Sequence, residues 1–448
     1  MSHKKSFLFA CWCFLSVSII AAQSVNNSPY SQFGLGNIQP QTFIPQSSMG
    51  GLGVSYANGI SINNVNPALL SRNTRFTVFD LGIVMQGQET KTATQAQQSF
   101  GGTLQYLSLA FPVTANKPDT AFLKWTTGLS LMPYTTVNYE TRTTQALTGS
   151  LTDVYTTNYK GTGGLTRIDF TNGFQLGKNL SLGLKTSYIF GDITKQVSSA
   201  PRLPSIVVVT NPQTGAIVGV FPNSLTTSGI NRINHSDFVF KLGAAYRYPF
   251  SKKLFLNAGV THEFATKLKS QLFQSIQNSG PTGGVFITDT LASEAKGFVK
   301  LPSQTQFGLS IEETYHWMIG ADFTILKAKD FRNFDGQPSY QETSYQFTVG
   351  SEWTPNFSSI SNYFSRVTYR VGFNHSLLPL CFNGKQLQET GLSTGASFPV
   401  GRGLTLLNVG ATVGKRGTTS NNLVEERYIR MYLGISINDR WFIPRKID

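Results

Sequence analysis

Apolar and polar residues alternate along most of the chain with a period of two, which is the repeat of a β-strand whose two faces meet different surroundings. The clearest example covers residues 427–438, where every second residue is apolar: Ile429, Met431, Leu433, Ile435 and Ile437. Many of these segments run to about ten residues or more, whereas strands of soluble proteins average about 5–6 residues. Charged residues fall on one face and aromatic residues on the other. This pattern is typical of a transmembrane β-barrel, which is apolar toward lipid and polar toward its lumen.

The alternation predicts about fourteen antiparallel strands, and bacterial single-chain barrels have an even strand number. They are expected at residues 76–86, 100–113, 120–133, 163–177, 179–192, 231–250, 253–269, 295–312, 315–328, 341–354, 363–375, 387–399, 402–414 and 426–438. The segments between them are alternately long and short, as external loops and periplasmic turns are, so both termini are expected in the periplasm. The long segment 193–230 holds an apolar run that is expected to form a small hairpin capping the mouth. Because lipid offers no hydrogen-bond partner to a sheet edge, the barrel of residues 76–438 is expected to close on itself.

Residues 23–75 precede the first expected strand, and the stretch 49–71 within them lacks a strong helical period. We expect them to form a hatch in the lumen, because the stretch 49–71 is rich in Gly and Asn and ends in a turn-forming Asn-Pro-Ala sequence. The residues expected to build or gate the hatch are Met49, Gly50, Gly51, Gly53, Asn66, Pro67 and Ala68. Residues 1–22 have the charged, apolar and small-residue order of a secretory signal peptide. Residues 439–448 are expected to form a periplasmic tail.

Composition favours a barrel over a soluble enzyme or a helical membrane bundle. Only 13% of the residues are charged, compared with about 25% in typical soluble domains. No series of apolar runs of about 20 residues is present, as a helical bundle would need. Cys381 is the only cysteine that follows the signal peptide, so internal disulfides are excluded from the mature chain. We therefore expect an exported protein in the outer membrane of a Gram-negative bacterium.

The formal net charge of +14 comes from basic residues that are scattered rather than clustered. Nucleic acid is therefore not expected as a partner, because nucleic-acid sites concentrate their basic residues on one face. Outer-membrane lipid and the phosphates of lipopolysaccharide are the partners that this charge predicts.

Motifs for catalysis are not found. The mature histidines, His235, His262, His316 and His375, fall on separate strands or turns without the spacing of metal ligands. We expect neither an enzyme nor a cofactor. Charged residues at lumen-facing positions are expected to line a wet channel or to support the hatch: Arg167, Asp169, Lys185, Lys241, Arg247, Asp322, Glu352, Arg366, Arg370 and Arg430.

The N-terminal region resembles that of FadL/TodX-type outer-membrane transport proteins, and its sequence is most similar to the Bacteroidetes branch of that family. The resemblance lies in three stretches, residues 28–36, 48–53 and 64–70. The resemblance implies a fourteen-stranded barrel with a luminal hatch. It also implies passive uptake of hydrophobic small molecules, either long-chain fatty acid-like or aromatic, which leave sideways through the wall near a distorted third strand. Gly128 and Pro133 lie in the third strand here and form a possible lateral gate. Proline cannot donate a ladder hydrogen bond, so Pro133 is expected either to weaken the pairing or to end the strand.

Two alternatives stay open. The PorV-type subunits of type IX secretion resemble the same architecture but bind exported proteins, and a structural surface barrel would carry nothing. The inward basic residues speak against a purely apolar conduit. An apolar, ligand-sized cavity above the hatch would favour transport, whereas a filled cavity beneath a flat external rim would favour a protein partner.

Overall fold

Antiparallel strands make up most of the molecule. The computed structural model describes residues 27–440 except 57, 116–120, 147–153, 203–205, 211–212, 216, 223–224, 281–283, 383, 402–403 and 421–422. The signal peptide and most of the C-terminal tail lie outside the described residues. In chain order the elements are η1 (Pro29–Gln32), β1 (Asn37–Ile38), α2 (Ile44–Ser47), η2 (Pro67–Arg72), β2 (Thr77–Lys91), β3 (Ala96–Pro112), β4 (Leu123–Ala146), β5 (Val154–Leu176), β6 (Leu180–Arg202), β7 (Ile206–Thr210), β8 (Ile217–Pro222), β9 (Thr226–Pro249), β10 (Leu254–Glu263), β11 (Thr266–Ser279), β12 (Val285–Leu301), β13 (Gln304–Glu313), β14 (Trp317–Leu326), η3 (Ala328–Asp330), β15 (Ser344–Trp353), η4 (Phe364–Arg366), β16 (Thr368–Phe382), β17 (Lys385–Val400), β18 (Thr405–Gly417) and β19 (Glu425–Asp439).

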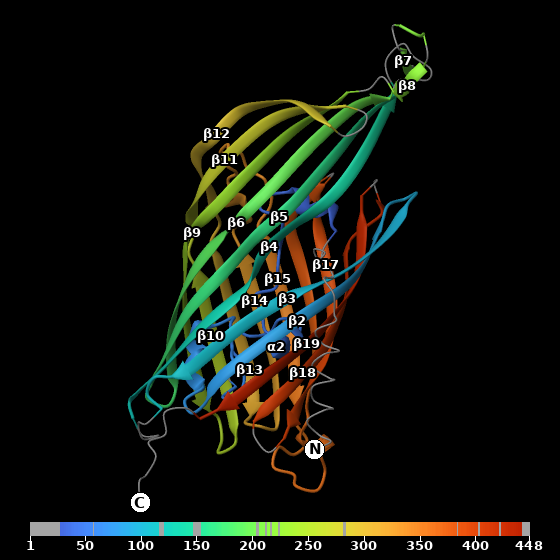
Figure 1. The fold of residues 1–448 in the computed structure, drawn as a ribbon. Coiled ribbons are helices and arrows are strands. Elements are labelled where there is room, and N and C mark those ends of the chain that lie inside the picture. The colour runs from blue at the N-terminus through green and yellow to red at the C-terminus, as the bar shows by residue number, and fades with distance from the viewer. Residues whose placement is uncertain are drawn as a thin grey trace, which may run out of the picture.

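The strands form one closed 14-strand antiparallel barrel (Figure 1), which confirms the predicted fold. β19 pairs with β2 over its full length and so joins the last wall strand to the first. β10 and β11 form a single wall strand that is interrupted between Glu263 and Thr266, and both of them pair with β9. β12 and β13 form the next wall strand in the same way, with an interruption between Leu301 and Gln304.

The alternation seen in the sequence separates the outer surface from the lumen. On β19 the outward side chains are exposed: Ile429, Met431, Leu433 and Ile437. The inward side chains of the same strand are buried: Tyr428, Tyr432, Ser436 and Asn438. An apolar belt around a polar interior is the arrangement of a barrel that spans a membrane. Among the described residues, no helix has both the length and the apolar character needed to cross a bilayer.

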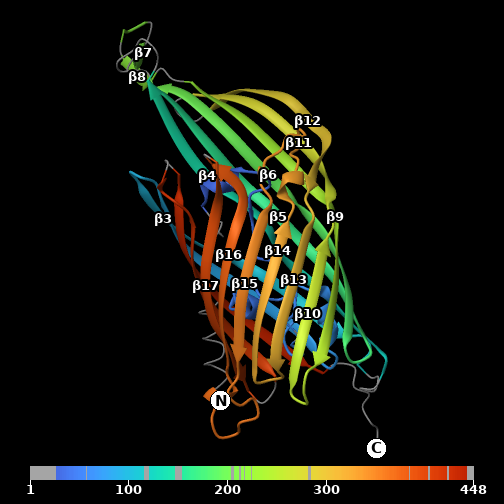
Figure 2. The same ribbon diagram turned by 180° about the vertical axis from the view of Figure 1, so that it is seen from behind.

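The barrel wall is much taller on one side. β4 and β9 have 24 residues each, and β5 and β6 have 23, whereas β14 and β15 have 10. About 9–11 residues suffice to cross a bilayer, so the long strands continue well beyond the apolar belt. With β11 and β12 they form a curved sheet that leans over one end of the barrel (Figures 1 and 2). We call this sheet the overhang and this end of the barrel the long end; the opposite end, with mostly brief turns, is the short end.

The overhang corrects the predicted strand ends. Residues 134–162, 193–230 and 271–293 were expected to be loops, but most of them continue the strands. Their sequences are richer in polar residues than the belt, so the regular apolar alternation stops where the belt stops although the ladder continues. The hairpin expected near residue 206 exists as β7 and β8. It lies at the tip of the overhang rather than across the mouth (Figure 2).

The overhang has a small hydrophobic core of its own, on its inner face. Buried residues of β4, β5, β6, β9, β11 and β12 pack there around two side chains from other parts of the chain, Leu35 and Phe331. Phe331 belongs to the connection between β14 and β15, which folds inward over the mouth. Tyr340 of the same connection packs against this core, and its ring lies 4.9 Å from that of Phe331. The long end is therefore covered on one side by the overhang and filled by this connection.

Candidate functional site

The N-terminal segment lies inside the barrel, as predicted. Met49 is fully buried with Leu52, Tyr56 and Met318. Gly50 and Gly51 have φ angles of 72° and 97°, a left-handed region that favours glycine. The predicted hatch residues therefore lie together in the lumen, and their role in gating stays a prediction.

The Asn-Pro-Ala turn is fixed by the side chain of Asn66. Its carboxamide oxygen accepts from the main-chain N–H of Ala68 at 3.0 Å, and its nitrogen donates to the carbonyls of Val54 (2.8 Å) and Ala244 (3.2 Å). Pro67 occupies the first turn of η2, where a missing N–H costs nothing. Ala68 is fully buried against Ala245 of β9. Asn66 thus joins two parts of the hatch to the barrel wall.

Carboxylates of the wall hold the hatch from the other side. Asp322 Oδ2 accepts from the main-chain N–H groups of Gly53 (2.7 Å) and Val54 (2.9 Å). Glu352 accepts from the hydroxyl of Tyr56 at 2.6 Å and from Arg370 at 2.8 Å. Burial, followed by the nearby Glu352, raises the pKa of Tyr56, so its hydroxyl remains a donor. Charge-assisted bonds of this kind are about twice as strong as neutral ones.

Glycines of the barrel wall lie directly against the hatch, a feature the sequence analysis missed. A methyl group at Gly183 or Gly243 would overlap with Asn66-Pro67-Ala68, and one at Gly372 would overlap with the main chain of Met49 and Gly50. Methyl groups on other wall glycines would also overlap with hatch atoms: Gly173, Gly259, Gly308, Gly350, Gly395 and Gly434. We call this ring the glycine belt. It lets the hatch lie directly against the wall, at several positions through its backbone, and the recurrence of Gly at lumen-facing positions was the available signal.

The barrel wall is incomplete between β3 and β4. These strands pair only between Leu107–Pro112 and Thr126–Leu131. Beyond Leu131, β4 continues to Ala146 beside β5, and the first part of β3 continues beside β2, so the two strands diverge (Figure 1). We call the V-shaped gap between them the notch.

Pro133 lies at the lower end of the notch. The register of β4 against β5 shifts between Pro133 and Thr135, which is a β-bulge at Tyr134. Pro133 does not end the strand, so that expectation is wrong: β4 continues to Ala146. The pairing of β4 with β3, however, ends at Leu131, two residues before Pro133. Gly128 pairs with Ala110 in the intact part of the ladder, below the notch.

Residues 27–41, which we call the strap, cross the notch. On one side, β1 pairs with Thr135 and Thr136 of β4, and Gln39 N donates to Tyr134 O at 2.9 Å. On the other side, Gln88 of β2 donates to Asn27 O at 3.0 Å. The strap is joined to the β4 edge by only a few hydrogen bonds, each worth about 1 kcal/mol net.

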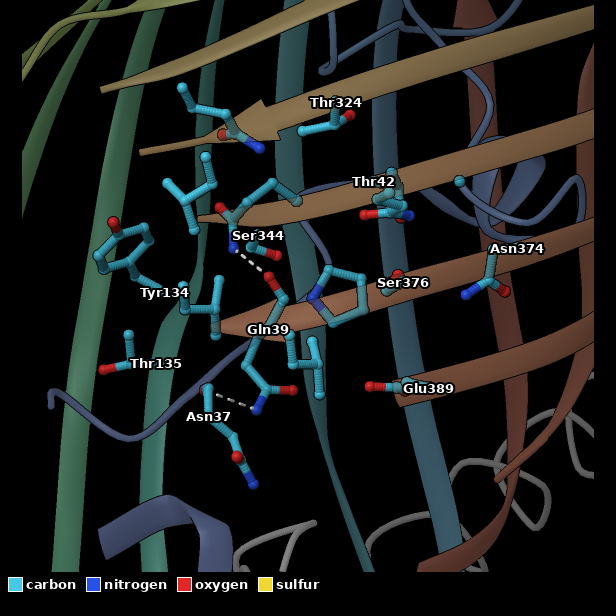
Figure 3. Close-up of a pocket in the computed structure, with 18 of the residues that line it drawn as sticks. Asn37, Gln39, Thr42, Tyr134, Thr135, Thr324, Ser344, Asn374, Ser376 and Glu389 are labelled. Atoms are coloured by element: carbon cyan, nitrogen blue, oxygen red, sulfur yellow. Dashed lines mark hydrogen bonds between the residues drawn. The ribbon is translucent and has the colours of Figure 1, made fainter. Parts of the chain in front are cut away.

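A cavity of about 360 Å³ lies between the hatch and the long end. Figure 3 shows Asn37 and Gln39 of the strap facing Tyr134 and Thr135 on one side and Asn374, Ser376 and Glu389 on the other. The strap therefore separates this long-end cavity from the notch. A second cavity of about 440 Å³ lies beyond the hatch at the short end.

The predicted lumen-lining charges divide between the two cavities. Those at the long end are Arg167, Lys185, Lys241, Asp322 and Arg430, and those at the short end are Arg247, Glu352, Arg366 and Arg370. Asp169 is fully buried behind the first group. Arg366 was expected on a strand but lies in η4, because β16 begins only at Thr368.

The floor of the long-end cavity is an ionic cluster. Asp169 binds Arg167 at 2.7 Å and Lys185 at 3.4 Å, and Lys185 also donates to the side chain of Asn64 in the hatch at 2.8 Å. Lys241 and Arg430 donate instead to Gln306 and Gln86, and neither forms an ion pair within the described residues. The cavity therefore keeps two cations whose hydrogen-bond partners are neutral. Its upper part is more apolar, with Leu35, Phe331 and Tyr340 among others.

Within the part of the chain that the structure describes, no three His, Cys, Asp or Glu side chains come together as a metal site.

Several solved structures are similar to this fold. The CymD monoaromatic hydrocarbon channel matches with a TM-score of 0.54 and 14% identity, covering 91% of this chain and 99% of that one. The toluene transporter TbuX of Ralstonia pickettii has a TM-score of 0.54 and 14% identity, with coverages of 90% and 100%. A FadL homologue from Pseudomonas aeruginosa has a TM-score of 0.51 and 13% identity, with coverages of 91% and 100%. At this identity the likeness concerns the fold, and it supports the FadL-type architecture.

Sequence comparison adds a family. No curated protein matches the chain. The family model BamG matches residues 3–448. Because this match spans almost the entire chain, the protein belongs to the BamG family.

Proposed function

We propose that the protein is a passive outer-membrane channel for hydrophobic small molecules, which pass from the long-end cavity sideways through the notch. The long end faces the exterior and the short end faces the periplasm. The proposal is supported by the fold shared with a monoaromatic hydrocarbon channel and a toluene transporter. The direction proposed is uptake from outside the cell, as expected from the sequence.

One observation carries the proposal: β3 and β4 do not pair above Leu131, and the strap that covers their gap also lines the cavity. The straight route along the barrel axis is occupied by the hatch, which contacts the glycine belt on strand after strand. Displacing the strap breaks its hydrogen bonds with β4 and β2 and exposes the buried side chains of Tyr30 and Leu35. Displacing the hatch breaks the charged contacts of Asp322 and Glu352 and its contacts with wall strands around the lumen. Sideways passage requires a shorter part of the chain to move, which supports it over the axial route.

The cavity favours an amphipathic ligand. Its volume of about 360 Å³ falls in the range of small-molecule sites, about 300–1,000 Å³. Lys241 and Arg430 suit a polar or anionic head group, and the apolar residues near the mouth suit a hydrocarbon part. Lateral release into lipid then gains about 0.8 kcal/mol for each CH₂ group that leaves water.

Locking the strap to β4 tests the route. Ile38 and Thr135 are direct partners in the β1–β4 pairing, and paired positions of this kind lie close enough for a cross-strand disulfide. We expect the double variant Ile38→Cys/Thr135→Cys, oxidised in cells, to take up radiolabelled oleate or toluene at least tenfold more slowly, because the strap can no longer leave the notch. A reductant should restore uptake.

The single variants Ile38→Cys and Thr135→Cys are the matched controls, since they change the same side chains without a cross-link. Mass spectrometry of the purified barrel gives the fraction of cross-linked molecules. Normal uptake by a completely cross-linked barrel would refute lateral passage. The alternative of a barrel that binds exported proteins stays a prediction from the sequence.

A further inference from the structure

The proposed sideways route does not pass through the short-end cavity. It lies on the far side of the hatch from the notch and is about 440 Å³ in volume. Its walls come from the underside of the hatch, including Tyr56 and Arg72, and from strand ends and turns of the barrel. A ligand that leaves through the notch never enters it, so its chemistry needs another explanation.

The lining of this cavity is rich in positive charge. Its cations are Arg72, Lys124, Arg247, Arg366 and Arg370, and its carboxylates are Glu312, Glu313 and Glu352. Each carboxylate already has a partner: Arg247 binds Glu312 at 2.6 Å, Arg370 binds Glu352 at 2.8 Å, and His316 lies 3.2 Å from Glu313. The interior therefore offers an excess of cations to an incoming group.

Two of these cations form no ion pair within the described residues. Arg72 donates to the main-chain carbonyls of Lys178 (3.3 Å) and Asn179 (3.2 Å), and Arg366 lies 5.3 Å from the ring centre of Tyr363. Burial, followed by the nearby Arg247, lowers the pKa of Arg72 to about 10. Positive charge is thus crowded here, and an acidic group would relieve the crowding.

The rim of the cavity is apolar. The connection between β15 and β16, residues 354–367, is the longest at the short end and holds several exposed apolar side chains. Ile360 is completely exposed, with a relative accessibility of 101%, and Phe364 is 65% exposed. Phe357 stacks on Tyr315 at 5.1 Å, and both line the mouth of the cavity. An apolar cluster on a projecting turn is typical of an interaction site.

This connection is held in shape by its own hydrogen bonds. Asn356 N donates to Ser365 O at 2.7 Å, and the Tyr363 hydroxyl donates to Pro399 O at 3.0 Å. The apolar side chains are therefore displayed in a preformed arrangement, which lowers the entropic cost of binding.

The position of the rim favours a protein over the membrane. The connection projects past the other short-end turns, along the barrel axis (Figures 1 and 2). Trp353 and Tyr369, whose rings lie 6.0 Å apart, are the aromatic residues on the wall beside it, where a membrane interface would lie. The cationic interior is enclosed by the barrel, where lipid head groups have no access.

We propose that the short end is a docking site for a partner protein that places an acidic segment in the cavity and apolar side chains on the rim formed by residues 354–367. Electrostatic complementarity would orient the segment, and burial of the rim would hold it.

A defined peptide tests the proposal. The probe is a fluorescein-labelled peptide, Asp-Glu-Asp-Phe-Glu-Asp-Leu-Glu, and the reference is the same peptide with Lys at every acidic position. Anisotropy is measured with the complete barrel in nanodiscs of zwitterionic lipid. We expect only the acidic peptide to bind, and more weakly as salt rises, since about 0.1 M salt screens charges beyond about 10 Å.

Two variants locate the binding. Arg366→Glu and Ile360→Asp/Phe364→Asp should each weaken it at least tenfold, whereas Lys252→Glu, on the exposed turn 250–253, should leave it unchanged. Heat-modifiable gel mobility confirms that each variant is folded. Equal binding of the Lys peptide, or equal binding by all variants, would overturn the proposal. So would association of the barrel with phosphatidylglycerol vesicles that is lost in Ile360→Asp/Phe364→Asp, because it would make the rim a membrane anchor.

Discussion

Individual glycines decide how the hatch fits the barrel. Along a strand, glycine normally weakens pairing because it has no side chain to pack. Here the lumen-facing glycines leave room for the main chain of the hatch, so the space of a missing Cβ is filled by another backbone. Gly372 illustrates this, since its position faces Met49 and Gly50, two residues that were predicted to belong to the hatch. The hydrogen bonds of Asp322 and Asn66 then hold the hatch backbone in the space that the glycines leave.

The variant Gly372→Ala tests this role. Its methyl group would overlap with the hatch backbone, so hatch or wall must shift, and overpacking of this kind costs about 1–3 kcal/mol. We expect a loss of that size in the free energy of unfolding, measured by urea titration of the purified barrel. The matched control is Gly229→Ala on β9, where a methyl group would have no neighbour within 4 Å. An equal loss in both variants would contradict a specific contact with the hatch.

At the scale of elements, the divergence of β3 and β4 is the decisive feature. Both strands keep their other neighbours, so the notch leaves one edge of each strand without a strand partner over much of its length. The strap occupies the β4 edge near Thr135 and Thr136 but goes no farther than Asn138. Exposed sheet edges are ordinarily avoided, so the notch is an exception that the proposed lateral passage would explain.

Hydrogen exchange measures this edge directly. Alternate amides of β4 between Tyr139 and Ala146 point away from β5, and no strand lies on that side. In the detergent-solubilised barrel we expect these amides to exchange at least a hundredfold faster than those of β5 between Tyr155 and Thr162, which pair on both sides. Equal protection of the two segments would mean that the notch is closed in solution.

At the scale of the whole molecule, the barrel has two dissimilar ends. The long end carries the overhang, a small core around Phe331 and a cavity above the hatch. The short end carries brief turns, one projecting connection and a cationic cavity. The hatch separates the two cavities, and under our two proposals each end has a different partner: a small amphipathic molecule at the long end and a protein at the short end.

This orientation predicts which end reacts with an impermeant reagent. Cys381 is first replaced by Ser, and Cys is then introduced at Thr94, on the exposed turn between β2 and β3 at the long end, or at Lys252 at the short end. We expect a membrane-impermeant maleimide to label the Thr94→Cys variant in intact cells and the Lys252→Cys variant only after the outer membrane is permeabilised. The reverse labelling pattern would mean that the short end faces the exterior, and it would contradict both proposals.

Local pattern was sufficient for much of the architecture. The strand number, the separation of lipid-facing from lumen-facing residues and the position of the hatch all follow from the period of two and from turn chemistry, which depend on residues close together in the sequence. The same pattern placed most of the charged residues correctly inside the lumen. It failed at the overhang, where only part of the inner face is apolar and no regular alternation marks the strands, and at Arg366, where a turn of helix precedes the strand.

The notch, the contacts of the wall glycines with the hatch and the two cavities could come only from the tertiary structure. Alternation tells which way a side chain points, but not whether the strand beside it stays paired, because that depends on residues far away along the chain. Pro133 was a visible candidate for a break, yet its effect depended on β4 continuing beside β5 and on a strap from residues 27–41 crossing the gap. Likewise, a glycine on a strand acquires meaning only from the backbone that packs against it.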